Sequence, residues 1–388
     1  MHMRYALISP LLLLCACNSG ARQTTESPVV ASGQEPFSVQ SIARFDEPWS
    51  MAFLPDGKLL VTEKRGRLII FDPANGSKIA ITGTPTVDYG GQGGFGDIAL
   101  APDYASSHRV YYSYVEAGDD DTRGAVVDSA TLDPATHALS NTRRIWTQQP
   151  KVTGNGHFSH RLLFSPDGRY LFISSGERQK FDPAQDLSTN LGKVVRLFPD
   201  GSIPPDNPFA SRGGVTAQIW TLGHRNLLGL AWDSRGRLWE DEMGPRGGDE
   251  LNLILKGRNY GWPIVSNGDH YDGRSIPRHS TRPDFEAPKT SWNPVISPSS
   301  LLIYSGEMFP QWRGHALITG LSSESLVDVQ IDGDQARGVH RYPMGHRLRK
   351  IVQGLDGSLW ILQDGNDGAL LKLTPKTSKT PGKQAKND

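Results

Sequence analysis

The chain has 388 residues, with 41 basic and 41 acidic side chains and therefore a formal net charge of zero. Nucleic-acid binding requires a basic patch, so this balance predicts no nucleic-acid partner. The 42 glycines and 27 prolines are typical of many short strands joined by tight turns. Both cysteines, Cys15 and Cys17, lie near the N-terminus, so we expect a folded body without thiols or disulfides.

The N-terminal stretch MHMRYALISPLLLLCACNSG has the pattern of an export signal. Arg4 precedes an apolar run from Tyr5 to Leu14, which is too short to span a bilayer. The next residues resemble a bacterial lipobox, which predicts a signal peptide over residues 1–17 and a lipid on Cys17. Ordinary secretion is the alternative. Both predict export, and the lipobox predicts a lipoprotein of the periplasm or outer membrane.

Composition divides the remaining chain into three parts. Residues 18–36 are rich in Ser, Thr, Gly and Glu without periodicity, which predicts a flexible tether. Residues 37–375 carry the patterned sequence and form the predicted domain. Residues 376–388 are Lys-rich and lack large apolar side chains, so we expect a disordered tail.

One phrase recurs through the central part: an apolar run, a turn and a β-rich run. Examples are LLFSPDGRYLFISSGE and IVQGLDGSLWILQDG, and the six copies are centred near residues 56, 103, 167, 235, 313 and 356. Asp-Gly favours a tight hairpin, and alternation favours half-buried strands. A four-stranded blade needs roughly 40–50 residues. The pattern therefore predicts an all-β fold, a six-bladed β-propeller with long loops at one face; a pair of β-sandwiches is the alternative.

Two Gly-rich loops in the first half carry polar residues suited to a site. GGQGGFGDIAL places Gln92 where the backbone can approach a ligand closely, although a plain turn is the alternative. TGNGHFSHRL places His157 directly after a turn and His160 three residues later. If this segment is extended, only one of the two histidines faces the centre. We choose His157, because it lies at the loop–strand junction.

Three later segments combine charged residues with turns. TLGHRNLLGLAW places Arg225 and Asn226 directly before a strand, where a capped turn is the alternative to a ligand site. EDEMGPRGGDELN offers carboxylates and turn carbonyls, which suit a hard cation such as calcium, or else form a solvated acidic loop. In GHRLRKIV, Arg347 and Arg349 point to the same side if extended and suit an anionic planar partner, or else a surface salt-bridge pair.

From about residue 47 to 375 these segments together resemble the soluble aldose (glucose-type) sugar dehydrogenases that use pyrroloquinoline quinone. The most specific stretches are GHRN, GPRGGDELN, NYGWP and RLRKIVQGLDGSLW, in this order. The resemblance implies a six-bladed propeller, an aldose substrate oxidised to its lactone, an external electron acceptor of unknown identity, and two cofactors, pyrroloquinoline quinone (PQQ) and Ca²⁺.

The resemblance also implies roles for individual residues. His157 matches the general base, and Arg225 would stabilise charge on the quinone. The quinone-contacting positions match Gln92, Arg225, Asn226, Tyr271, Arg347 and Arg349. The calcium that anchors the quinone would meet the carbonyls of Gly244 and Pro245, and a loop-supporting calcium would meet Glu250 and Tyr260.

Three departures from the family pattern predict weaker quinone binding. Leu227 and Leu228 stand where Pro and Gln are usual, Ser322 replaces a common lysine, and Met243 replaces a polar residue before Gly-Pro. Two rival functions follow from the same residues. One is a calcium-dependent lactonase, which would need a central cage of carboxylates. The other is a non-catalytic sugar- or surface-binding lipoprotein with a decaying cofactor site.

Overall fold

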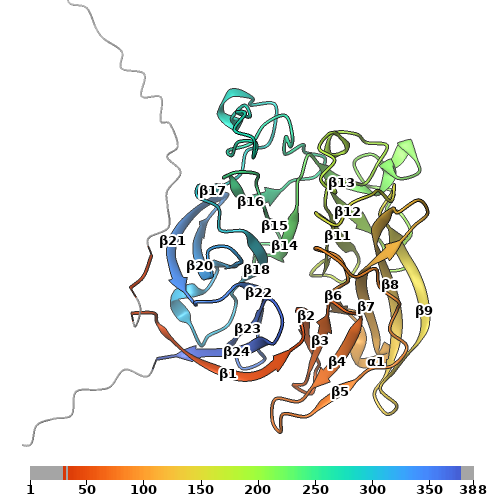
Figure 1. Ribbon diagram of the computed structural model, residues 1–388, viewed down its shortest axis with the longest axis vertical. Coiled ribbons are helices and arrows are strands. Elements are labelled where there is room, and N and C mark those ends of the chain that lie inside the picture. Colours follow the sequence, from red (N-terminus) through yellow and green to blue (C-terminus); the bar gives the residue numbers. More distant parts are fainter. Residues whose placement is uncertain (1–28, 32–33, 377–388) are drawn as a thin grey trace, which may run out of the picture.

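The computed structural model describes residues 29–31 and 34–376 and consists of six four-stranded antiparallel sheets around a central axis (Figure 1). This arrangement confirms the predicted six-bladed β-propeller. The predicted signal peptide, the lipobox and nearly all of the predicted C-terminal tail lie outside the described residues. Of the predicted tether, Val29 forms a parallel bridge with Arg341.

The blades follow one another along the chain. Blade 1 contains β2 (Pro48–Phe53), β3 (Leu59–Glu63), β4 (Arg67–Phe71) and β5 (Lys78–Ala80). Blade 2 contains β6 (Phe95–Leu100), β7 (Arg109–Ala117), β8 (Arg123–Asp133) and β9 (Ala138–Thr147). Blade 3 contains β10 (Ser159–Phe164), β11 (Leu171–Ser175), β12 (Lys193–Leu197) and β13 (Ile219–Leu222).

Blade 4 contains β14 (Leu227–Trp232), β15 (Leu238–Glu242), β16 (Asp249–Ile254) and β17 (Thr290–Trp292). Blade 5 contains β18 (Pro298–Ile303), β19 (Ala316–Gly320), β20 (Ser325–Asp332) and β21 (Gln335–Pro343). Blade 6 contains β22 (Leu348–Gln353), β23 (Leu359–Gln363), β24 (Gly368–Pro375) and, as its outer strand, β1 (Phe37–Phe45).

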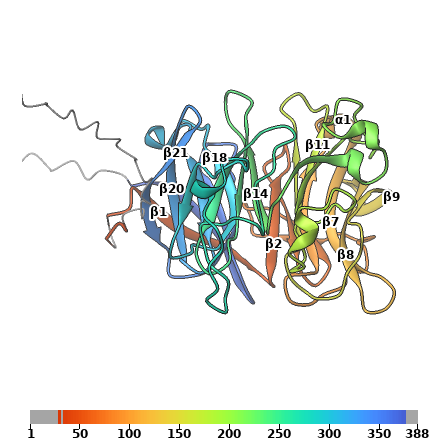
Figure 2. The same cartoon turned by 90° about the horizontal axis from the view of Figure 1, so that it is seen from above.

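Each recurring phrase is the hairpin between the first two strands of one blade. Gly57, Gly168 and Gly357 occupy these turns with positive φ angles of 87°, 71° and 83°, which glycine adopts without strain. Blade 6 closes the ring, because β1 from the start of the domain pairs with β24 from its end. Seen from the side, the molecule is a disc whose loops gather at its two faces (Figure 2).

The hydrophobic core is divided among the gaps between neighbouring blades. Between blades 1 and 2, for example, Leu60 and Ile70 pack with Ile98 and Tyr112. Five further clusters fill the other gaps in the same way. Each sheet is therefore buried on both faces, and the blades hold one another in place by apolar packing.

A polar layer lies along the axis, where the first strands of the blades meet. The third residue of each first strand contributes to it: Ser50, Asp97, Arg161, Gly229, Ser300 and Lys350. Gly229 leaves space for the carboxylate of Asp241 on β15, the second strand of the same blade. A Cβ on Gly229 would lie 2.6 Å from Asp241 Oδ2. The layer thus holds two acidic and two basic side chains.

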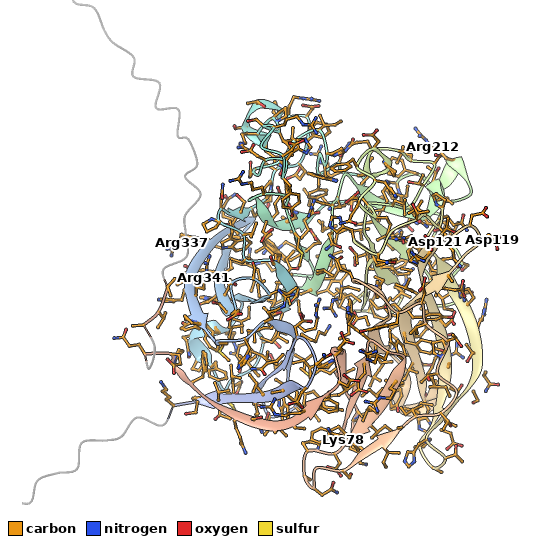
Figure 3. The ribbon with its side chains drawn as sticks, in the orientation of Figure 1. Lys78, Asp119, Asp121, Arg212, Arg337 and Arg341 are labelled. Atoms are coloured by element: carbon orange, nitrogen blue, oxygen red, sulfur yellow. The ribbon has the colours of Figure 1, made fainter. Side chains whose placement is uncertain are left out.

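The outer rim carries charged residues at the strand edges. Lys78 on β5 and Arg337 and Arg341 on β21 lie at the periphery in Figure 3. Charges on outer strands discourage edge-to-edge pairing with other chains. Helical structure in the described part comprises α1 (Tyr104–Ser107) and short 3-10 turns, and no described helix is long and apolar enough to cross a membrane.

Candidate active site

His157 and Glu177 form a buried pair at one end of blade 3. His157 lies just before β10, and Glu177 lies just after the neighbouring strand β11, so adjacent strand ends bring the two together. His157 Nδ1 lies 2.5 Å from Glu177 Oε1, and both side chains are buried. The second Glu177 oxygen accepts a hydrogen bond from the backbone N–H of Phe181 (2.8 Å). The carboxylate therefore fixes the orientation of the imidazole.

The surroundings set the charge of this pair. Burial lowers the pKa of His157; the Glu177 hydrogen bond raises it, and the positive charges of Arg225 and Arg178 lower it, for a net value below the usual range. Burial raises the pKa of Glu177, but the hydrogen bonds from His157 and from the backbone of Phe181, with the positive charge of Arg225, outweigh burial and leave the pKa of Glu177 below its usual range. At neutral pH the pair is thus a neutral imidazole beside a carboxylate.

His157 opens into a cavity of about 340 Å³. The cavity brings together most of the predicted site: Gln92, His157, Arg225, Gly244, Pro245 and Tyr271 all line it. Gln92 is held by His157, whose backbone N–H donates to Gln92 Oε1 (2.7 Å). This contact needs a glycine beside it, because a Cβ on Gly91 (φ 54°) would lie 2.5 Å from the carbonyl oxygen of Asn155. The Gly-rich loop is therefore a close approach between two blades.

A second cavity of about 330 Å³ adjoins the first and shares Gln92, Met243 and Ser297 with it. Arg347 and Arg349 line this second cavity, as their predicted common direction requires. Both arginines bind Asp364: Arg347 Nε lies 2.8 Å from Oδ2, and Arg349 Nη2 lies 2.5 Å from Oδ1. Two guanidinium groups share one carboxylate, so the pair keeps an excess positive charge.

Arg225 and Asn226 leave the GHRN turn in different directions. Arg225 Nη1 donates to the carbonyls of Met243 (2.9 Å) and Gly244 (2.7 Å), while its buried Nε has no partner among the described residues. Asn226 is fully buried, accepts from Ser159 Oγ (3.1 Å) and lies 3.6 Å from Met243 Sδ. Asn226 is absent from the lining of both cavities, so it supports the site from behind.

Tyr271 stands at the open side of the first cavity. It belongs to segment 255–289 between β16 and β17, the longest connection of the propeller, and its side chain is 73% exposed. The Arg225 guanidinium lies 6.0 Å from the Tyr271 ring centre and 5.2 Å from that of Trp262. The Tyr271 ring thus borders the cationic part of the cavity.

The four predicted metal-binding residues surround a third, small cavity of about 10 Å³, enough for one water-sized occupant. Gly244 and Pro245 lie between this cavity and the larger one. Glu250 is buried, with Oε1 3.4 Å from His279 Nε2. The Tyr260 hydroxyl already donates to the Leu253 carbonyl (2.6 Å), so only the main-chain oxygen of Tyr260 remains as a metal ligand.

The prediction that only one of the two histidines faces the centre is wrong. His160 lines the second cavity, while His157 lines the first. The expectation assumed an extended segment, whereas His157, Ser159 and His160 all have positive φ angles. The environments differ: His160 is stacked on Trp49, and burial first, then the charge of Arg161, lowers the pKa of His160 to about 3. His160 lacks a carboxylate partner among the described residues.

The family departures occupy distinct places around the cavities. Leu228 lines the second cavity, and Met243 lines all three. Ser322 is absent from all three linings, and its hydroxyl lies 2.7 Å from that of Ser297. Sequence reasoning missed Glu177 and Asp364, which pair with His157 and the arginines. The signal for Glu177 was its position directly after a buried strand.

Comparison with known proteins assigns the class. The family described as Glucose / Sorbosone dehydrogenase matches residues 45–372. The chain is 36% identical over 382 residues to "Aldose sugar dehydrogenase YliI" of Escherichia coli, covering 97% of this chain and 100% of the relative. It is 26% identical over 475 residues to "Quinoprotein glucose dehydrogenase B" of Acinetobacter calcoaceticus, covering 96% and 98%.

Two solved structures resemble the propeller closely. The apo form of the soluble aldose sugar dehydrogenase from Escherichia coli superposes with a TM-score of 0.83 at 37% identity, covering 88% of this chain and 100% of that one. The PQQ-bound aldose sugar dehydrogenase from Streptomyces coelicolor gives 0.70 at 28% identity, covering 88% and 98%. The chain belongs to the glucose/sorbosone dehydrogenase family. This membership confirms the predicted class, a quinone-dependent oxidoreductase.

Proposed function

We propose that this chain oxidises aldoses at the anomeric carbon to lactones, with PQQ and calcium as cofactors and His157 as the general base. The observation that carries the proposal is the neutral His157 held by Glu177 in a cavity that also contains Arg225. The names of the relatives support the substrate class and the quinone. The lactone follows from removing two hydrogens from the anomeric C–H and O–H of a cyclic aldose.

The residues present fit an anionic planar quinone with several carboxylates. Arg347 and Arg349 share one acidic partner, so their surplus charge can meet a carboxylate of the cofactor. The partnerless Nε of Arg225 is a buried donor that needs an acceptor. The side chain of Leu228 cannot form the hydrogen bond to the quinone that the usual glutamine could form, and Ser322 lacks the positive charge of the common lysine. We therefore expect the quinone to bind more weakly than with the usual family residues.

The proton transfer is assigned to His157. Its Nδ1 faces Glu177, so Nε2 is the atom left to take the proton of the sugar's anomeric hydroxyl. The imidazole has to be neutral to accept a proton, and its lowered pKa keeps it neutral at neutral pH. Once protonated, it is stabilised by the Glu177 carboxylate. Glu177 is thus a positioning residue that acts through His157.

PQQ, when bound, supplies the electrophilic carbonyl carbon that accepts the hydride of the sugar. The chain supplies charge where negative charge develops: the Arg225 guanidinium projects into the cavity that His157 lines. The carbonyls of Gly244 and Pro245 would hold a calcium ion at the same cavity, since hard cations take carbonyl and carboxylate oxygens. Glu250 and the Tyr260 carbonyl would hold a second calcium at the small cavity.

We also propose that the protein is exported to the periplasm or outer membrane and anchored by a lipid on Cys17. The lipobox at residues 14–17 supports this. An external acceptor would then take electrons from the reduced cofactor outside the cytoplasm.

Reconstitution tests the proposed function. Protein freed of metals by EDTA should reduce a redox dye in the presence of an aldose only when PQQ and Ca²⁺ are both restored. Full activity when PQQ or Ca²⁺ is left out, or activity that depends on NAD instead of PQQ, would refute the proposal. Lactone formation is checked by product analysis with glucose as the aldose.

A further inference from the structure

Blade 4 contains a buried group of acidic side chains on one face of the strand pair β15–β16. Glu240 lies opposite Asn252, and Glu242 lies opposite Glu250, so side-chain alternation directs all four to the same side. All four are buried, with Glu240 and Asn252 fully so. Asp241 alternates to the other side, toward the axis of the propeller. The face therefore collects three carboxylates away from solvent.

Nothing in the described part of the chain neutralises this charge. No lysine or arginine side chain there forms an ion pair with Glu240, Glu242 or Glu250; the basic groups beside them are His224 and His279. The backbone N–H of Arg225 donates to Glu242 Oε2 (2.5 Å), but the guanidinium of Arg225 binds main-chain carbonyls instead. The calcium proposed above would meet Glu250 alone of the three. Buried carboxylates without a compensating cation are strongly unfavourable, so Glu240 and Glu242 call for a cation of their own.

Two fully buried oxygens point to a missing ligand. Glu240 Oε1 and Asn252 Oδ1 have no hydrogen-bond partner among the described residues. The Asn252 amide nitrogen lies among the carboxylates, 3.1 Å from Glu240 Oε2 and 3.2 Å from Glu242 Oε1. These two contacts give the amide nitrogen of Asn252 its acceptors, but the amide oxygen of Asn252 and Glu240 Oε1 still lack a hydrogen-bond donor. An unpartnered oxygen at such a place requires a donor or a cation.

His224 completes a metal-binding set with the two carboxylates. One ligand atom each of His224, Glu240 and Glu242 lies within 4.8 Å of those of the other two. His224 Nδ1 lies 3.1 Å from Glu242 Oε1, and Nε2 lies 2.9 Å from Thr221 Oγ1. Metal-binding histidines commonly show this arrangement, with one nitrogen toward the ligand group and the other on a polar partner that fixes the ring.

We propose that His224, Glu240 and Glu242 bind a divalent transition-metal cation of the Zn²⁺ class. One buried imidazole with two buried carboxylates suits a structural site of this class, whereas calcium favours all-oxygen sets. The site lies next to the calcium position proposed at Glu250 and Tyr260, because Glu242 lines that small cavity as well, but it is a different ligand set, since His224 and Glu240 do not line it. It does not depend on the quinone.

The position of this site gives it a structural consequence. His224 directly precedes Arg225, and Glu242 directly precedes Met243 and Gly244, so a cation between them joins two strand ends that border the active-site cavity. A bound cation therefore stabilises blade 4 and fixes the backbone that positions Arg225.

The test uses the full chain without quinone. Metal-free protein is equilibrated with excess Ca²⁺, then titrated with Zn²⁺, and bound zinc is counted by mass spectrometry while thermal unfolding is followed. We expect one zinc per chain that excess calcium does not displace, and an unfolding midpoint that rises with zinc concentration. Co²⁺ in place of zinc should give a visible absorption band without thiolate character.

Three variants locate the site. Glu240→Gln, which keeps the side-chain shape, should weaken zinc binding by more than about 100-fold, and Thr221→Val by about 10–100-fold through loss of the ring's partner. Asp241→Asn, next in sequence but on the other side of β15, should retain the wild-type zinc and Co²⁺ band. Equal zinc binding by wild type and Glu240→Gln, or complete displacement of zinc by calcium, would overturn the proposal. Loss of quinone activity alone would leave it standing, because no readout uses quinone.

Discussion

At the scale of single residues, the site depends on pairs that restrict one side chain by another. Glu177 orients His157, Asp364 holds Arg347 and Arg349 together, and Gln92 accepts from the backbone of His157. Glu177 is buried and Asp364 is half-buried, where hydrogen bonds to charged groups are strong, whereas Gln92 is exposed. The reactive groups are therefore held in place before a substrate binds.

Replacing Glu177 by Gln should change both the rate and its pH dependence. The carboxylate raises the pKa of His157, while burial and the charges of Arg225 and Arg178 lower it. Without the carboxylate the pKa falls further, so the acid limb of the kcat/KM profile should move to lower pH. Turnover should also drop by about 10²-fold or more, because glutamine does not stabilise the imidazolium.

Glu177→Asp is the matched control, since it keeps the charge at a shorter reach. It should retain the position of the acid limb better than Glu177→Gln does. An unchanged acid limb in Glu177→Gln, measured with the reconstituted enzyme, would show that another group controls the profile.

At the scale of elements, connections 176–192 and 255–289 form the mouth of the site. The buried side chain of Lys193 holds the first of these connections in place. Lys193 on β12 donates from Nζ to the carbonyls of Pro183 (2.7 Å), Ala184 (3.1 Å) and Leu191 (2.6 Å). These acceptors belong to connection 176–192, which carries Glu177. Gln185 of the same connection donates to the carbonyl of Trp262 (2.6 Å) and so links it to segment 255–289.

Lys193→Met should therefore loosen the mouth while the blades persist. Methionine keeps the length and apolar stem but leaves buried carbonyls without donors, at a cost of about 1–3 kcal/mol in unfolding free energy. We expect a lower unfolding midpoint and a KM for the sugar that rises more than kcat falls. A variant with wild-type stability and KM would show that the connection is held by other contacts. Lys180→Met, on the same connection but exposed, is the control.

At the scale of the whole molecule, the axis is held by charges contributed by several blades. Asp97 lies 3.3 Å from Arg161 Nη1 and 3.4 Å from Lys350 Nζ, and it also accepts from Ser50 and from the backbone of Leu162. Burial raises the pKa of Asp97, but Lys350, Arg161 and these hydrogen bonds outweigh it and bring the pKa to about 2. Arg161 in turn donates to the Leu228 carbonyl (2.7 Å), so the layer supports the floor of the cofactor cavity.

Asp97→Asn should destabilise the propeller by about 3–5 kcal/mol at neutral pH, because it leaves the buried Arg161 and the half-buried Lys350 without their carboxylate. The folded-state pKa lies below the ordinary value of 3.8, so this stabilisation is fully present above about pH 4 and is lost as pH falls through about 2. The difference in urea unfolding free energy between wild type and variant should shrink over that window. A constant difference across it would contradict the ionic account of the layer.

The fold was predictable because each blade repeats a hairpin pattern, as at Gly57 and Gly168. Such a pattern lies in adjacent residues, so it can be recognised in the sequence without knowing which distant residues are in contact. The gathering of Gln92, His157 and Arg225 followed from the common position of their loops before first strands. The pairings of Glu177, Asp364 and Asp97 were not predictable, because they join different strands or blades and depend on backbone details such as the positive φ of His157 and His160.

In the proposed reaction His157, not His160, takes the proton of the sugar. This assignment is tested by the stopped-flow rate at which an aldose reduces bound quinone in His157→Gln, His160→Gln and wild type, with quinone affinity measured in parallel. We predict a rate about 10²–10⁴-fold lower in His157→Gln with quinone still bound, and a much smaller change in His160→Gln. Comparable losses in both variants, or a larger loss in His160→Gln, would contradict the account.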